Sequence, residues 1–282
     1  MLIKRFIFFI GLLLTITSQA NEKIPENETT VFNETFSWQA MGNIFVTYNP
    51  SLLKGHDQEE AFDYLGAGIL LDVYYEGFFI QSNHRRVSLQ GAELGYQLVV
   101  TPKWELDLIS KTYIFGYEPD DIIDSADKPI PTLEGLSNRE PGEGVGLRYT
   151  RYHANASLSV DFATLAPLSE SNGWVLDVLY TYMLPYRNWD FYLSAGYTHY
   201  SEKVMDYFYG VNSAEVTPDR AYYEANAGYR VQLELFAQHP ISTSWSFAGG
   251  ATYSRYSDST KDSPLVDAQD LAKVKLGVIY VF

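Results

Sequence analysis

Residues 223–235 read Tyr-Glu-Ala-Asn-Ala-Gly-Tyr-Arg-Val-Gln-Leu-Glu-Leu, and this stretch decides the fold. Apolar side chains occupy the odd positions from Tyr223 to Leu235, whereas polar residues and one glycine occupy the even positions. A period of two residues places the two sets on opposite faces of a β-strand. The stretch therefore predicts a strand with one apolar face and one polar face.

The same alternation recurs in residues 174–184, 244–257 and 272–282. These runs reach ten or more residues, longer than the ~5–6 residues usual for strands of soluble proteins. They have the length that a tilted strand needs to cross a bilayer. Tryptophans near the ends of several runs suit an interfacial girdle, namely Trp104, Trp174, Trp189 and Trp245. We expect an all-β fold, a transmembrane antiparallel up-and-down β-barrel.

The alternating segments predict about twelve strands, an even number as in bacterial barrels. We place them near residues 36–48, 66–75, 77–83, 88–99, 103–117, 143–152, 156–165, 174–184, 189–201, 222–237, 244–257 and 272–282. Short connections alternate with longer, mostly acidic ones at 49–65, 118–142, 202–221 and 258–271. Short periplasmic turns and long external loops are typical of outer-membrane barrels. This pattern predicts periplasmic termini and external long loops.

The N-terminal region predicts export. Lys4 and Arg5 precede a short apolar run, and Ser18-Gln19-Ala20 supplies the small residues of a cleavage site. We expect residues 1–20 to be a signal peptide cleaved after Ala20, residues 21–35 a periplasmic N-terminal segment, and residues 36–282 the outer-membrane barrel.

Composition excludes several classes of protein. The formal charge of −15 argues against a nucleic-acid partner, because such proteins need basic surface to neutralise phosphates. The absence of cysteine excludes disulfide scaffolds and thiolate metal sites. The expected surroundings are outer-membrane lipid and lipopolysaccharide, and no cofactor or metal is expected.

Strand phase also predicts which charged residues face the lumen. A charged side chain facing lipid at the bilayer midplane costs ~2–4 kcal/mol for Arg or Lys, so the charges should point inward. The predicted lumen network comprises Asp72, Glu93, Asp107, Arg148, Asp161, Asp177, Glu224, Arg230 and Glu234. These groups form either a structural network of ion pairs or the lining of a narrow cation-preferring passage for small solutes.

The last strand ends on Phe282, in phase with Val274, Leu276, Val278 and Tyr280. It resembles the terminal strand of outer-membrane barrels, whose closing aromatic residue is read by the assembly machinery. We therefore expect Phe282 to be the barrel-closing terminal aromatic.

Two motifs in the last third of the chain carry a family resemblance. They are Tyr209-Gly210-Val211, preceded by Tyr207-Phe208, and Asp262-Ser263-Pro264-Leu265-Val266. Together with the closing segment 277–282 they resemble the MipA/OmpV family. Residues 217–220 depart from the family pattern, which has a glycine-bearing loop there, so the departure concerns an external loop.

The resemblance implies an outer-membrane barrel without catalytic residues. The founding member of the family is named as an interactor of the lytic transglycosylase MltA. It implies a scaffold for the murein-synthesis machinery, with a lytic transglycosylase and a murein synthase as partners. Adhesion to a host surface ligand is the other role that the family implies.

Two further patterns point to chemistry. His199 and Ser201 are two residues apart on a predicted strand, which places both on its lipid-facing side, as in outer-membrane phospholipase. Glu202-Lys203 replaces the continuation of that motif. A lipase is therefore the least favoured function, and a girdle histidine beside a loop serine is the simpler interpretation. The acidic run formed by Glu118, Asp120, Asp121, Asp124 and Asp127 either binds Ca²⁺ or Mg²⁺ or is a solvated loop.

Overall fold

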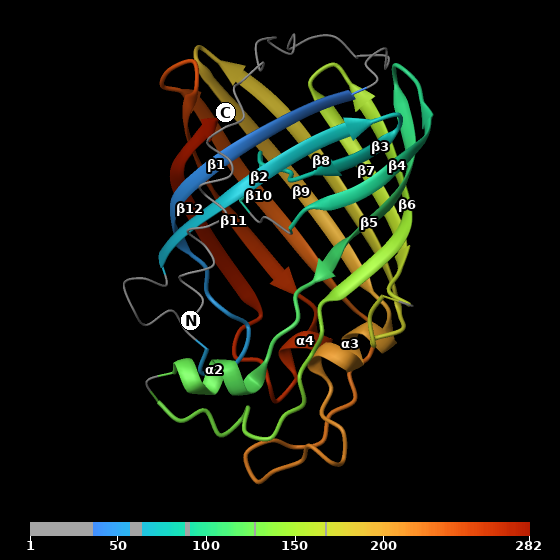
Figure 1. The fold of residues 1–282 in the computed structure, drawn as a ribbon. Helices are drawn as coiled ribbons and strands as arrows, with labels where there is room; N and C mark the ends of the chain where they lie inside the picture. Colours follow the sequence, from blue (N-terminus) through green and yellow to red (C-terminus); the bar gives the residue numbers. More distant parts are fainter. Residues whose placement is uncertain (1–35, 57–63, 88–90, 127, 167) are drawn as a thin grey trace.

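The computed structural model describes residues 36–56, 64–87, 91–126, 128–166 and 168–282, so the predicted signal peptide and periplasmic segment lie outside the described residues. Twelve strands make up most of this part of the chain (Figure 1). They are β1 (Phe36–Tyr48), β2 (Leu65–Tyr75), β3 (Phe78–Gln81), β4 (Glu93–Val100), β5 (Trp104–Ile114), β6 (Gly142–His153), β7 (Ala156–Thr164), β8 (Trp174–Tyr186), β9 (Trp189–Tyr200), β10 (Gly228–Pro240), β11 (Trp245–Tyr256) and β12 (Asp270–Val281).

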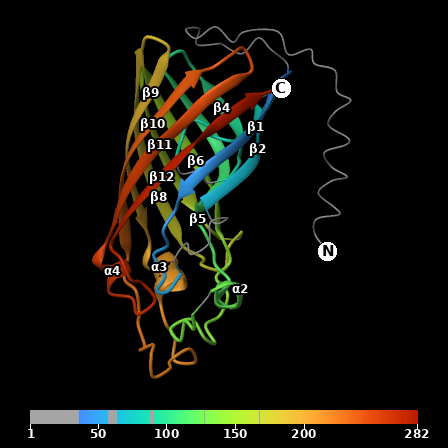
Figure 2. The ribbon, with the colours of Figure 1, turned by 90° about the vertical axis from the view of Figure 1, so that its left-hand side faces the viewer.

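Each strand pairs with its neighbour in the chain, and β1 pairs antiparallel with β12 to close the barrel (Figure 2). The closing register runs from Met41 opposite Val281 to Tyr48 opposite Val274. The prediction of a twelve-stranded antiparallel barrel is confirmed. None of the helices in the described ranges has the length and apolar character needed to cross a membrane.

The alternation of polar and apolar residues along the sequence corresponds to the inner and outer faces of the barrel wall. On β10, Leu233 and Leu235 are exposed on the outer wall, whereas Gln232 and Glu234 are buried in the lumen. Outward apolar side chains are the surface that lipid requires, because lipid cannot solvate polar groups.

Three short helices gather at the end of the barrel that carries the long connections (Figure 1). They are α2 (Pro119–Ser125), α3 (Glu202–Tyr209) and α4 (Asp258–Lys261). The described residues of 49–56, 115–141, 201–227 and 257–269 form, with these helices, what we call the loop cap. The other end has only short turns, such as Glu76-Gly77, where both residues have positive φ as a tight hairpin turn requires.

The start of β10 differs from the prediction. Tyr223, Ala225 and Ala227 continue the alternation, yet β10 begins at Gly228. Tyr223 instead exchanges two backbone hydrogen bonds with Val211 in the loop cap. Local pattern alone does not distinguish a barrel strand from an extended segment that pairs elsewhere.

The connection between β3 and β4 also differs from the prediction. β3 has only four residues, and β4 begins at Glu93 rather than at residue 88. Between them, Val87 packs inside the barrel with inward-facing residues of six strands: Met41, Leu70, Tyr192, Phe236, Ala248 and Ile279. Residues 82–87 therefore fold into the lumen, and we call them the inward segment.

Candidate functional site: the lumen and the loop cap

Arg148 is the centre of a charge network on the inner wall. Its guanidinium forms an ion pair with Glu93 at 2.6 Å and another with Asp161 at 2.7 Å. A second nitrogen–oxygen contact supports each pair, so both carboxylates are held in the two-pronged geometry that guanidinium favours. The three residues come from β6, β4 and β7, so the network ties together strands that are not all adjacent.

Lys111 extends this network to β8. Its Nζ lies 2.6 Å from Asp161, 3.0 Å from Asp177 and 3.8 Å from Glu93. Asp177 also accepts a hydrogen bond from Thr198 on β9. Lys111 was missed in the predicted set, although it is in phase with Asp107 on the same strand and that phase is enough to find it.

The other predicted lumen residues have different surroundings. Asp72 contacts His84 at 3.4 Å, and Glu234 forms an ion pair with Arg86 at 3.5 Å, both through the inward segment. Asp107 is buried, and its Oδ1 has no hydrogen-bond partner among the described residues. These placements agree with the predicted inward face.

Glu224 and Arg230 differ from the predicted lumen network. The placement of Glu224 in the lumen is wrong, because it precedes β10, is exposed and accepts a hydrogen bond from the Tyr222 hydroxyl. Arg230 does lie on β10, where its Nη2 donates to the Thr198 hydroxyl at 3.2 Å. Among the described residues no carboxylate lies within ion-pair distance of Arg230, so it does not form the strand-bridging pair that its phase predicts.

The two family motifs meet in the loop cap. Ser263 Oγ donates a hydrogen bond to the Tyr209 carbonyl oxygen at 2.6 Å and accepts one from the Leu265 amide. Val211 and Leu265 are fully buried in one apolar cluster, which also contains Leu53, Ile122, Ile130, Leu133 and Leu136. Gly210 caps α3, and Val266 bridges to Leu53. Asp262 is exposed and Pro264 half-buried, so the motif residues mainly build the loop cap.

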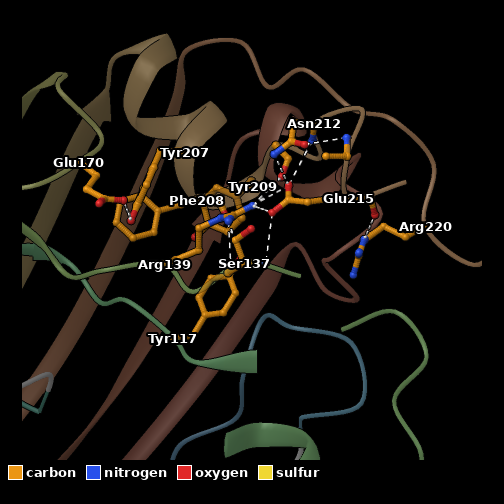
Figure 3. A network of polar contacts seen from close by, with 12 residues as sticks. Tyr117, Ser137, Arg139, Glu170, Tyr207, Phe208, Tyr209, Asn212, Glu215 and Arg220 are labelled. Atoms are coloured by element: carbon orange, nitrogen blue, oxygen red, sulfur yellow. Dashed lines mark hydrogen bonds and ion pairs between the residues drawn. The ribbon is translucent and has the colours of Figure 1, made fainter. Parts of the chain in front are cut away.

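A buried ion pair joins two of the long connections in the loop cap (Figure 3). Arg139 Nη2 lies 3.0 and 3.1 Å from the two carboxylate oxygens of Glu215. The Arg139 guanidinium also stands 5.7 Å from the centre of the Tyr207 ring, and the Tyr207 hydroxyl accepts a hydrogen bond from the Glu140 amide. These contacts hold residues 137–140 against α3 and the loop after it.

The surroundings of two cap residues shift their pKa values. Burial raises the pKa of Glu215, but hydrogen bonds from Ser137 and the charge of Arg139 outweigh it and hold the pKa below its usual value. Burial raises the pKa of Tyr117 to about 12. Its hydroxyl therefore stays protonated and donates to the Phe208 carbonyl oxygen at 2.7 Å.

Arg220, in the segment that departs from the family pattern, is among the most buried side chains of the described chain. Its Nε donates to the Glu215 carbonyl oxygen and its Nη1 to the Thr132 carbonyl oxygen, both at 2.7 Å. The departure thus concerns a residue that holds the loop cap together.

A cavity of ≈ 480 Å³ lies beside α2. Its lining includes Tyr117, Glu118, Asp121, Arg139 and Glu140. In the described part of the chain no three acidic or histidine side chains converge as a metal ion requires. The described members of the acidic run therefore have no metal-binding geometry, and Asp127 lies outside the described residues.

His199 and Ser201 do not share one exposed face. β9 ends at Tyr200, and Ser201 is the residue before α3. The Ser201 side chain is buried, and its Oγ accepts a hydrogen bond from the Trp174 amide, whereas the His199 ring lies 5.2 Å from the Trp174 ring in a tilted arrangement at the outer wall. The predicted one-face arrangement is wrong because a helix begins directly after the strand.

Phe282 lies at the short-turn end. Its amide donates to the Ala40 carbonyl oxygen at 3.1 Å, and its ring contacts Tyr280 edge-on at 5.0 Å. Its position beside the β1–β12 seam suits the closing role, and its recognition during assembly stays a prediction.

Comparison with known proteins decides the family. Residues 44–282 match the family described as MltA-interacting protein MipA. The chain belongs to this family. It is an outer-membrane β-barrel of the MipA/OmpV type, as the resemblance predicted.

Relatives include the MltA-interacting protein of Escherichia coli K12, which is 29% identical over 151 residues, covering 53% of this chain and 60% of the relative. The putative outer membrane protein YiaT of the same organism is 26% identical over 191 residues, covering 67% of this chain and 74% of the relative. The chain thus spans about 60% of the length of the MltA-interacting relative.

Among solved structures, an outer membrane channel from Pseudomonas putida F1 matches with a TM-score of 0.40 and 13% identity, covering 93% of this chain and 100% of that one.

Proposed function

We propose that this protein is a non-enzymatic binding protein of the outer membrane, a scaffold whose partners are a lytic transglycosylase and a murein synthase. The family description names an interaction with MltA, and this supports the choice of partner. The single observation that carries the proposal is that the barrel interior is filled, which favours a binding role over an open channel.

Three layers fill the interior. At the long-loop end, α3 inserts Val204, Met205 and Phe208 among inward-facing residues of the wall, including Tyr113 and Val175. Below it lies the network of Arg148 and Lys111 described above. At the short-turn end, the inward segment places Val87 in the second apolar cluster. A diffusion channel needs a continuous polar path, and each apolar layer interrupts such a path.

The chemistry of the wall supports a non-enzymatic role. The Ser201 hydroxyl is buried and accepts a hydrogen bond from Trp174, so it has neither access to a lipid ester nor an activating base in contact. Glu93, Asp161 and Asp177 pair with Arg148 and Lys111, which is a structural use of charge.

The proposed orientation places the short turns in the periplasm, where murein enzymes act, and the loop cap outside among lipopolysaccharide. In this orientation the turns present exposed residues to a periplasmic partner, such as Lys103 and the 153–155 turn. A host surface ligand would instead contact the loop cap, and this is the alternative binding role.

A pull-down with a purified lytic transglycosylase and a murein synthase tests the proposal. We expect capture by the full chain, and loss of capture when His153-Ala154-Asn155 is replaced by a Gly-Ser-Gly turn. A matched change in the loop cap, Ser213-Ala214 to Gly-Ser, should leave capture intact. Loss of capture only with the cap variant would place the enzyme contact on the loop cap and contradict the proposed orientation, and no capture by the full chain would refute the scaffold.

The rival function is a narrow cation-preferring passage, favoured by the luminal carboxylates Asp72, Asp177 and Glu234. Planar-bilayer recordings separate the two functions. We expect the resting protein to show no steady conductance, and a steady current that falls when Asp177 is replaced by Asn would favour the passage.

A further inference from the structure

We propose that the tip of the β8–β9 hairpin and the adjoining end of β10 form a binding site on the outer wall for the headgroup of an anionic phospholipid, phosphatidylglycerol. We call this the rim site, and it consists of Tyr186, Arg187, Asn188, Trp189 and His239. The choice of a phospholipid rests on the proposed periplasmic position of the short turns. The site itself does not depend on the proposed murein-enzyme partner.

The rim site lies where the lipid-facing wall ends. β8 ends at Tyr186 and β9 begins at Trp189, and these two residues are opposite each other across a two-residue turn. Tyr186 is exposed and in phase with Tyr182 and Leu184, which are exposed on the outer wall. Aromatic side chains at the end of a lipid-facing strand lie at the level of the lipid headgroups. The rim site therefore contacts headgroups rather than acyl chains.

Arg187 supplies the cationic group of the rim site. Its Cζ stands 5.2 Å from the centre of the Tyr186 ring, and this cation–π contact keeps the guanidinium at the outer side of the wall. Arg187 is exposed, and in the described part of the chain no carboxylate lies within ion-pair distance of it. Asp190 is in phase with Tyr192, which packs in the lumen, so its carboxylate is on the other side of the wall. A guanidinium binds a phosphate through two parallel hydrogen bonds, and Arg187 is available to do so.

The backbone of Arg187 is strained. Its φ is 56°, in the left-handed region that favours glycine over residues with a Cβ. It occupies the first position of the two-residue hairpin turn, where glycine or asparagine is usual. Strain at an exposed position is a pointer to function. It is explained if this position requires the arginine side chain rather than the residue best suited to the turn.

His239 lies beside the turn and adds a hydrogen-bond acceptor. Its ring stacks on Trp189 with the centroids 4.7 Å apart, and its Nδ1 lies 2.8 Å from the Asn188 carbonyl oxygen. A carbonyl oxygen only accepts, so Nδ1 carries the hydrogen and Nε2 of the neutral ring is an acceptor. Among the described residues Nε2 has no hydrogen-bond partner. It can therefore accept a hydrogen bond from a glycerol hydroxyl of the headgroup whose phosphate Arg187 holds.

The charge of the rim site selects among phospholipids. The site has one full positive charge, on Arg187, and no negative one. Phosphatidylglycerol has a net charge of about −1, which matches it, and anionic headgroups attract basic residues at a membrane surface. Phosphatidylethanolamine has the same phosphodiester but adds an ammonium group, which Arg187 repels. We therefore expect the anionic lipid to bind more tightly.

Titration of the full chain in a non-ionic detergent with phosphatidylglycerol, followed by native mass spectrometry, tests the rim site. Arg187→Gln should raise the Kd of the first bound lipid about tenfold. The matched control Lys103→Gln removes the same charge from the exposed turn between β4 and β5 and should leave the Kd unchanged. Equal losses in the two variants would overturn the site in favour of diffuse attraction by the rim. Equal Kd values for phosphatidylglycerol and phosphatidylethanolamine would overturn the preference for anionic lipid.

Two further variants separate the site from the fold. Glycine adopts a φ of 56° without strain, so Arg187→Gly should weaken binding as much as Arg187→Gln without lowering the urea midpoint of the barrel. Unchanged binding by Arg187→Gly would overturn the site. His239→Phe keeps an aromatic ring beside Trp189 but removes Nε2, and it should raise the Kd about threefold. An unchanged Kd in His239→Phe would overturn the role of Nε2.

A cysteine in a neighbouring short turn tests the choice of phospholipid, because the chain contains no other cysteine. Thr243→Cys lies in the exposed turn between β10 and β11. A membrane-impermeant maleimide should label it only after the outer membrane is permeabilised. Labelling on intact cells would place the rim site in the outer leaflet and overturn phosphatidylglycerol as its ligand. Failure of the murein-enzyme pull-down, with lipid binding still lost in Arg187→Gln, would refute the scaffold alone.

Discussion

The lumen network and the loop cap both bury charged side chains, but they differ in the elements and groups that surround those charges. In the lumen, Arg148 and Lys111 project from regular strands and hold three carboxylates across the wall. In the loop cap, Arg139 and Glu215 come from irregular segments, and much of their support is backbone carbonyl and amide groups. The lumen network therefore stabilises the barrel as a whole, whereas the contacts of Arg139 and Glu215 stabilise only the loop cap.

The largest expected effect is in the lumen. Replacing Arg148 by Met leaves Glu93 and Asp161 buried without their bidentate partner, and this should lower the free energy of unfolding by ~3–5 kcal/mol. Urea unfolding of the barrel in lipid vesicles measures the change. Arg230→Met is the matched control and should cost clearly less, because its described contact is a hydrogen bond to Thr198. Equal losses in the two variants would contradict the central role of Arg148.

Breaking the cap pair should be local. With Arg139→Met, the buried Glu215 loses its partner, and the loop cap should open about tenfold more often. Limited proteolysis within residues 210–227 measures this opening, while the urea midpoint of the barrel should hardly move. A large shift of the barrel midpoint would mean that cap and barrel unfold as one unit.

The family motif should contribute a smaller amount to the loop cap. Ser263→Ala removes the hydrogen bond to the Tyr209 carbonyl oxygen and should destabilise the cap by about 1 kcal/mol. The same proteolysis assay detects it. Asp262→Ala, at the exposed neighbouring position, is the control and should have almost no effect. Equal rates of proteolysis in the two variants would mean that the Ser263 hydrogen bond does not stabilise the loop cap.

Acid should have the smallest effect, and only on the loop cap. The pKa of Glu215 is lowered on folding, so its contribution is fully present above the unfolded pKa and is lost as pH falls through the folded one. Protection of the cap from an acid-active protease should therefore decline below about pH 4.3, the usual glutamate pKa. The decline should be weaker in Glu215→Gln, which carries no titrating group there. An identical decline in that variant would assign the acid sensitivity to other carboxylates.

The same contrast explains what the amino-acid sequence predicted. Strand phase located Glu93, Arg148, Asp161 and Asp177, because a period of two residues assigns every strand residue to one face. It also extended β10 too far, since Tyr223 alternates in phase yet pairs with Val211. Strand phase predicts which face of the sheet a residue occupies, but it does not predict which residue it contacts. Phase alone therefore predicts a carboxylate partner for Arg230 that the described residues do not provide.

Strand phase does not predict the contacts of the loop cap. Arg139 and Glu215 are 76 residues apart in segments without periodicity, and no local pattern joins them. The sequence predicts a loop where α3 lies, because eight residues after a strand give too short a window for a helical period. The motifs around Tyr209 and Ser263 are identified only by their resemblance to the MipA/OmpV family. The contact between them is a feature of the folded loop cap that the resemblance does not predict.

The seam between β1 and β12 has a consequence for the order of events during biogenesis. Thr47 donates a hydrogen bond to the Val274 carbonyl oxygen across 227 residues of chain, so this contact is among the last that folding can form. Pairing over such a separation carries a large loop-closure cost and is intrinsically slow. Until the seam forms, β1 and β12 each present an unpaired edge that attracts other chains. A chain whose other strands have already paired therefore still carries two edges open to pairing with other chains, and the single antiparallel β1–β12 register removes both at once.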